Sequence, residues 1–158
     1  MTIQTAYLNN VFEIDKFQRT VNKTIGVAEE LQKKYHFDTI VFCGMSGAAM
    51  AFLLSHWLNL PLICVRKPTD GSHFHKYWKF DEKVLLCEGN LDAKRYLIVD
   101  DFIATGDTVN RIINAVKKEV PFAECVSLLM YAEPRNRNWS HEYWPAPLEV
   151  VSSKIEGD

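Results

Sequence analysis

The stretch Arg95–Asn110, RYLIVDDFIATGDTVN, decides both the expected fold and the expected site. An apolar run ends abruptly in two adjacent carboxylates, Asp100 and Asp101, and a Thr-Gly turn follows them. Apolar side chains then recur at i, i+3, i+4 and i+7, which is the spacing of one helix face: Val109, Ile112, Ile113 and Val116. The stretch therefore predicts a buried strand with an acidic pair at its carboxyl end, a polar turn, and a helix that ends near Lys117.

Strands and helices are expected to alternate along the rest of the chain. Short continuous apolar runs bounded by turn residues indicate strands that are buried on both faces. Such strands, alternating with helices, predict a doubly wound α/β fold, a mainly parallel central sheet with helices on both faces. The expected helices are 13–35 and 46–60, and the other expected strands are 38–44, 61–66, 83–89, 124–132 and 148–153.

The composition is that of an ordinary globular domain. The 158 residues are 47% apolar and 24% charged, and a single domain spanning residues 1–158 is expected. The longest apolar runs are too short to cross a membrane, and no signal peptide is visible at the N-terminus. The formal net charge of −2 gives no reason to expect a nucleic-acid partner.

The cysteines are expected to be reduced thiols. None of Cys43, Cys64, Cys87 and Cys125 forms a Cys-x-x-Cys pair, and three of them lie within or at the end of apolar runs. Buried thiols therefore fit better than disulfides or a zinc site, and the expected compartment is the cytoplasm.

The acidic pair and the turn after it predict a ligand site. Ligands of open α/β sheets bind beyond the carboxyl ends of the strands, which is where Asp100 and Asp101 are expected. The turn leads into a helix, so its N–H groups and the hydroxyls of Thr105 and Thr108 form a candidate anion site, and Gly106 allows close approach. Carboxylates beside a phosphate suit a ligand that also carries hydroxyl or metal-bound groups. The plainer alternative is that the acidic pair only caps the next helix.

Two other motifs that place phosphate chemistry beside a strand do not fit. The P-loop string G-x-x-x-x-G-K-[ST] does not occur in the chain. Receiver domains also have an acidic pair after a strand, but their pair normally lies near the N-terminus and a later strand ends in the phospho-acceptor aspartate. Here the later strand, within ECVSLLMYAEP, ends without an aspartate.

The string YLIVDDFIATGDT, Tyr96–Thr108, closely resembles the phosphoribosyl-pyrophosphate (PRPP) signature of type I phosphoribosyltransferases. That signature is an apolar strand, two acidic residues, two or three further residues, and Thr-Gly-x-Thr. The resemblance implies that Asp100 and Asp101 engage the ribose 2- and 3-hydroxyls and hold Mg²⁺ through water and PRPP. It also implies that five residues cradle the 5-phosphate: Ala104, Thr105, Gly106, Asp107 and Thr108.

The resemblance extends to the pyrophosphate end of PRPP. The family places a pyrophosphate loop after an early strand, and FCGMSGAAMA fits it with a strand end, a short turn and a helix. The residues concerned are Gly44, Met45, Ser46 and Gly47. Arg66 and Lys67 are candidates for stabilising the leaving pyrophosphate, with a solvated strand end as the alternative. The segment 67–83 matches the family's mobile catalytic loop in position.

The residue before Thr-Gly bears on the choice of base. In the hypoxanthine–guanine–xanthine branch it is usually an aspartate near the base, whereas here it is Ala104, as in the adenine branch. A methyl group cannot accept a hydrogen bond, so adenine or another amino-bearing base is favoured, while orotate and 6-oxopurines stay open. Glu133 is a candidate acceptor for an exocyclic amine, and Trp139 is a candidate for stacking.

The implied activity is phosphoribosyl transfer from PRPP to a nucleobase, with release of pyrophosphate, in nucleotide salvage. A small base-binding hood from the terminal segments and a homodimer are further expectations from the resemblance. Two alternatives stay open: a regulator that binds PRPP or a nucleotide and contacts RNA, and a PRPP-binding domain without turnover.

Overall fold

A central sheet organises the protein, shown by a computed structural model that describes residues 13–67, 86–133 and 148–154. Within these residues six strands form one sheet in the order β3-β2-β1-β4-β5-β6. The strands are β1 (Thr39–Cys43), β2 (Leu62–Val65), β3 (Cys87–Gly89), β4 (Arg95–Asp100), β5 (Glu124–Met130) and β6 (Glu149–Ser152). The helices are α2 (Ile14–Tyr35), α3 (Gly44–Leu58) and α5 (Asp107–Glu119).

The sheet is parallel except at one edge. β1 pairs in parallel with both β2 and β4, and the parallel pairing continues through β5 to β6. Only β3 runs antiparallel, against β2. The prediction of a mainly parallel sheet is therefore confirmed, with its one exception on the edge strand.

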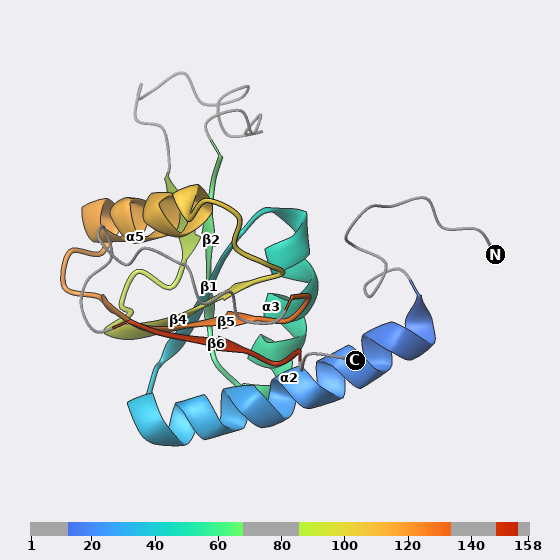
Figure 1. The fold of residues 1–158 in the computed structure, drawn as a ribbon. Helices are drawn as coiled ribbons and strands as arrows, with labels where there is room; N and C mark the ends of the chain where they lie inside the picture. The colour runs from blue at the N-terminus through green and yellow to red at the C-terminus, as the bar shows by residue number, and fades with distance from the viewer. Residues whose placement is uncertain (1–12, 68–85, 134–147, 155–158) are drawn as a thin grey trace, which may run out of the picture.

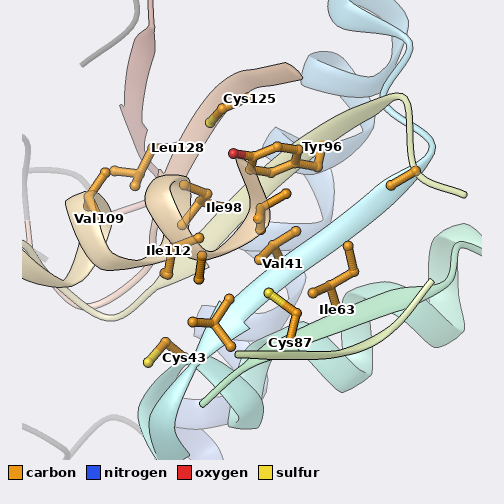
Figure 2. Close-up of a cluster of buried hydrophobic side chains, with 14 of the residues drawn as sticks. Val41, Cys43, Ile63, Cys87, Tyr96, Ile98, Val109, Ile112, Cys125 and Leu128 are labelled. Atoms are coloured by element: carbon orange, nitrogen blue, oxygen red, sulfur yellow. The ribbon is translucent and has the colours of Figure 1, made fainter. Parts of the chain in front are cut away.

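Helices cover both faces of the sheet (Figure 1). The amphipathic α5 buries Val109, Ile112 and Val116 against one face, where they join side chains from all six strands. Figure 2 shows part of this cluster. On the other face α2 and α3 pack together, and Ala28 and Leu54 are among the side chains they bury over the sheet. The doubly wound prediction is confirmed, and the helical spacing read from residues 109–116 identified the buried side of α5.

The boundaries of α3 differ from the prediction. The helix was expected over 46–60 after a turn through Met45 and Ser46, but it begins at Gly44 and ends at Leu58. Gly44 has a φ of +83°, a left-handed conformation that glycine adopts at little cost, so the chain turns within one residue and the helix starts at once. At the other end Asn59 takes a left-handed φ of 54° and stops the helix.

The structure also bears on the cysteines and on membrane insertion. All four cysteines are thiols outside any disulfide, and Cys43, Cys87 and Cys125 are buried, as the sequence predicts. Across the described parts of the chain, no helix combines the length and the apolar character needed to traverse a bilayer.

Candidate active site

The candidate site lies at β1 and β4, where the chain stops adding strands on one side of β1 and continues on the other side. From β1 the chain proceeds to β2 on one side, and later to β4 on the other side, so β1 and β4 are neighbours with their carboxyl ends together. Open α/β sheets bind ligands at such a switch point. A cavity of about 170 Å³ opens there, and its lining consists of Cys43, Ser46, Lys67 and the run from Asp100 to Val109.

Both carboxylates of the acidic pair are buried and held by backbone amides. Asp100 and Asp101 are only 5% and 4% exposed. The Asp101 N–H donates to Oδ1 of Asp100, and the Phe102 N–H donates to Oδ1 of Asp101, each at 2.9 Å. The chain beyond β5 holds the same segment from the other side, because Tyr131 N–H donates to the Asp100 carbonyl at 3.2 Å. The acidic pair is therefore fixed before any ligand arrives.

Burial makes the charge on Asp100 costly. Loss of hydration raises the pKa of Asp100 to about 8, and the neighbouring Asp101 carboxyl contributes to the rise, while Lys67 opposes it. The ionised form of Asp100 is therefore stabilised when a ligand supplies hydrogen-bond donors or positive charge. Ribose hydroxyls and a cation would supply both.

The turn after the acidic pair has the geometry of an anion site. Gly106 is the N-cap of α5 with a φ of 88°, and it offers no side chain to accept the first amides of the helix. Residues 104–109 all line the cavity, so this helix start faces the same space as the carboxylates. The Thr105 hydroxyl accepts the Asp107 N–H at 3.3 Å, which shapes the turn. Helix N-termini of this kind favour phosphate.

The β1–α3 connection contributes to the cavity unevenly. Ser46 lines it, and Gly44 borders Lys67, since a Cβ at Gly44 would lie 3.3 Å from the Lys67 amine. Met45 is 77% exposed, so its side chain lies at the surface. Gly47 serves packing, because a Cβ there would meet the Val99 carbonyl of β4 at 3.1 Å. Of the four residues expected in this loop, Ser46 and Gly44 are the two that the structure brings to the site.

The two basic candidates point in different directions. Lys67 lines the cavity, whereas the guanidinium of Arg66 lies 2.7 Å from the Glu88 carboxylate on the edge strand β3. Arg66 is not among the residues that line the cavity. The alternation of side chains along an extended chain explains the difference, since neighbouring residues face opposite sides.

Several residues of the site were not anticipated from the sequence. Cys43 lines the cavity, and burial raises the pKa of its thiol, while the positive charges of Lys67 and Arg111 oppose the rise. Tyr131, just beyond β5, is buried, and its hydroxyl donates to the Ser46 carbonyl at 2.5 Å. No local sequence pattern marks these residues, because the contacts join segments that are far apart in the chain.

The base-binding candidates are less well placed by the structure. Glu133 is exposed, its carbonyl accepts the Ser152 hydroxyl, and it is not among the residues lining the cavity. Trp139 lies outside the described residues, as does the expected loop 67–83 beyond Lys67 and as do the terminal segments of the expected hood.

A metal site made by the protein alone is not found within the described residues, where no group of three or more His, Cys, Asp or Glu side chains converges. The two carboxylates nevertheless suit Mg²⁺, which keeps several waters and is commonly bound by one or two carboxylates together with substrate phosphates. Asp100 and Asp101 fit an ion that arrives with a phosphorylated ligand.

Known proteins similar to this chain share one activity class. The adenine phosphoribosyltransferase of Thermotoga petrophila is 30% identical over 122 residues, which are 72% of this chain and 72% of that protein. The hypoxanthine/guanine phosphoribosyltransferase of Methanothermus fervidus is 27% identical over 104 residues, 61% of this chain and 55% of that protein. Scanned against models of protein families, the chain matches none.

Solved structures with a similar fold are also phosphoribosyltransferases. The crystal structure of orotate phosphoribosyltransferase from Aeropyrum pernix matches with a TM-score of 0.62 and 16% identity, covering 89% of this chain and 72% of that one. The adenine phosphoribosyltransferase structure from Rhodothermus marinus also gives a TM-score of 0.62, with 21% identity, 96% of this chain and 86% of that one. The chain belongs to the type I phosphoribosyltransferases, a family of enzymes.

We expect Asp100→Asn to stabilise the ligand-free protein at high pH. Because the folded-state pKa of Asp100 lies above the value of an unfolded aspartate, the wild type loses stability as pH rises from about 4 to about 8. The amide keeps an acceptor for the Asp101 N–H without a charge, so a gain of about 1–2 kcal/mol is expected above about pH 8. That gain should raise Tm by about 2–4 °C per kcal/mol.

The measurement is thermal unfolding at about pH 5 and about pH 9, without ligand. Asp107→Asn is the matched control, since it removes an exposed carboxylate that lines the same cavity. An Asp100→Asn gain that is no larger at the higher pH would contradict the assigned burial cost.

Proposed function

We propose that the protein transfers the 5-phosphoribosyl group of PRPP to a nucleobase and releases pyrophosphate. The observation that carries this proposal is the meeting of two fixed carboxylates and an open helix N-terminus in one cavity at the β1–β4 switch point. Sugar hydroxyls suit the carboxylates and a phosphate suits the helix start. The membership in the phosphoribosyltransferase family supports the same reaction.

In the proposed reaction the C1–O bond to pyrophosphate breaks, and its electron pair leaves with the pyrophosphate. A ring nitrogen of the base forms the new C1–N bond and loses its proton, which the released pyrophosphate or solvent takes up. The transition state resembles an oxocarbenium ion, so Asp100 and Asp101 hold the ribose and offset the developing positive charge. The helix start at Ala104–Thr108 fixes the 5-phosphate, and positioning supplies much of the rate.

The leaving pyrophosphate is assigned to Gly44, Ser46 and Lys67. Gly44 and Lys67 lie against each other, so a cation and the start of α3 meet at one end of the cavity. Mg²⁺, bound with PRPP, would neutralise part of the charge on the departing group. Arg66 is given a smaller part, because its partner is Glu88.

The preferred base is adenine or another amino-bearing base. Ala104 lines the cavity with an exposed methyl group, which cannot accept a hydrogen bond from a 6-oxopurine. The adenine phosphoribosyltransferase from Thermotoga petrophila is among the similar proteins, although relatives named for hypoxanthine/guanine and xanthine are too. Glu133 and Trp139 stay candidates for base contacts.

We expect pyrophosphate release from PRPP and Mg²⁺ in the presence of adenine, at a higher kcat/KM than with hypoxanthine, xanthine, guanine or orotate.

The double change Asp100→Asn with Asp101→Asn should lower turnover by about 10³-fold or more, since it removes both charges that face the developing cation. A coupled pyrophosphate assay measures both effects, and circular dichroism checks that the fold survives. Tight PRPP binding without turnover on any base would contradict the proposed activity and favour a regulatory PRPP-binding protein.

The two adjacent basic residues should differ sharply in effect. Lys67→Ala is expected to lower kcat by about 10²-fold, because it removes a cation from the pyrophosphate end of the cavity. Arg66→Ala, the matched control, removes the same charge from the neighbouring position and should change kcat by less than about tenfold, because its partner lies on β3. Equal losses in the two variants would refute the separate assignment.

We also propose that the protein forms a homodimer, as the family resemblance implies. The exposed surface of α3 carries apolar side chains at Met45, Phe52 and Trp57, with 77%, 59% and 61% exposure. Met45 and Phe52 share one helix face, whereas Trp57 lies toward α2, where its indole N–H donates to Glu29. A second copy would remove them from water, and this surface starts beside the cavity at Met45. Light scattering after gel filtration should report a dimer that Phe52→Asp weakens. A wild-type monomer at micromolar concentration would exclude it.

A further inference from the structure

A second cavity, of about 270 Å³, lies between the N-terminal half of α2 and the carboxyl ends of β5 and β6. Four of its seven lining residues are cations: Lys16, Arg19, Lys23 and Lys154. None of the seven is acidic. This cavity shares no lining residue with the one that contains the acidic pair, so it is a separate feature of the same edge of the sheet.

The cations of this basic cavity come from two segments that are distant in the sequence. Lys16, Arg19 and Lys23 are spaced i, i+3 and i+7 on α2, so they share one helix face, and Lys154 follows β6. Contacts between α2 and the β6 end bring them together, since the Thr24 and Ser153 hydroxyls share a buried hydrogen bond of 2.8 Å. The concentration of positive charge is therefore produced by the fold.

The position of these cations opposes the dipole of α2. The N-terminal end of a helix carries partial positive charge and favours acidic side chains; Asp15 provides one in the first turn, but Lys16 and Arg19 also lie in the first two turns. Glu13 offsets part of this charge through an ion pair with Lys16 at 2.7 Å, with both side chains well exposed. The helix dipole and the cations thus both contribute positive electrostatic potential, which a bound anion would neutralise.

The remaining lining residues add hydrogen-bonding groups and a rigid wall. Thr20 supplies a hydroxyl, whereas Ser153 is 5% exposed and its hydroxyl is engaged by the Thr24 hydroxyl and by the Met130 carbonyl at 3.2 Å. Tyr131 closes the cavity on the side of the proposed active site, and its hydroxyl is bonded to the Ser46 carbonyl. Tyr131 therefore separates the basic cavity from the pyrophosphate end of the other cavity.

We propose that the basic cavity is a second anion site that binds a small diphosphate-bearing ligand, either free pyrophosphate or the diphosphate of a nucleotide. Several cations around one concave space suit a multiply charged phosphate better than a single carboxylate. The volume lies just below the range of ordinary small-molecule sites, which favours a compact group. A nucleic-acid backbone is less well matched, because it requires an extended basic surface and the chain has a net charge of −2.

The test is calorimetric titration of the full-length protein with inorganic pyrophosphate, without Mg²⁺. Wild type should show two sites. The double charge reversal Arg19→Glu with Lys154→Glu should weaken one of them at least tenfold and leave the other within twofold. Lys67→Ala should weaken the other site instead. Lys94→Glu with Lys117→Glu, two exposed lysines away from both cavities, makes the same change in net charge and should leave both sites intact.

Three results would overturn the proposal. The first is a single site in wild type that Lys67→Ala abolishes. The second is an unchanged two-site isotherm in the Arg19→Glu, Lys154→Glu protein, and the third is an equal loss in the Lys94→Glu, Lys117→Glu control. Should the reversal variant fail to fold, as judged by circular dichroism, Arg19→Gln with Lys154→Gln takes its place.

Two further titrations distinguish the sources of the phosphate. Adenosine diphosphate that competes with pyrophosphate for the Arg19-dependent site would identify a nucleotide ligand, and absence of competition would identify the free anion. A single-stranded RNA oligonucleotide that binds through Arg19 and Lys154, when pyrophosphate does not, would overturn the small-ligand proposal in favour of an RNA surface. Because these measurements record binding alone, they are independent of whether the protein turns over PRPP.

Discussion

Two carboxylates buried side by side at the end of β4 constrain everything around them. Asp100 and Asp101 have lost almost all contact with water, and backbone amides of Asp101 and Phe102 donate to their carboxylates and orient them. The raised pKa of Asp100 reflects the free-energy cost of burying its charge. A fold retains such a cost where the charge is used, and the fixed orientation means that a ligand meets carboxylates already in position.

The sheet explains why the carboxylates, the start of α5 and Lys67 share one cavity. β1 and β4 are adjacent parallel strands, although β2, β3 and a long connection separate them in the chain. Their carboxyl ends therefore bring the start of α3 and the start of α5 to one place. Two helix N-termini and one lysine gather positive potential beside the acidic pair, which is the charge distribution that a sugar diphosphate requires.

Tyr131 joins this site to the basic cavity. Its ring lines the basic cavity near α2, and its hydroxyl holds the carbonyl of Ser46 at the proposed pyrophosphate end. Burial raises the pKa of the Tyr131 hydroxyl above its ordinary value, so the hydroxyl stays protonated and can donate a hydrogen bond at every physiological pH. The two cavities therefore have no lining residue in common, and Tyr131 connects them through its bond to the Ser46 carbonyl.

Local patterns in the sequence determined the strand and helix order, the acidic pair and the Thr-Gly turn, because hydrophobic periodicity and turn chemistry act over a few residues. The string at Tyr96–Thr108 carried the family assignment for the same reason. Tertiary structure alone decided that Lys67 faces the cavity while Arg66 turns to Glu88, since that depends on which strand lies beside β2. It also decided the gathering of Lys16, Arg19 and Lys154 around one space. Those features arise from contacts between segments far apart in the chain, which no local pattern records.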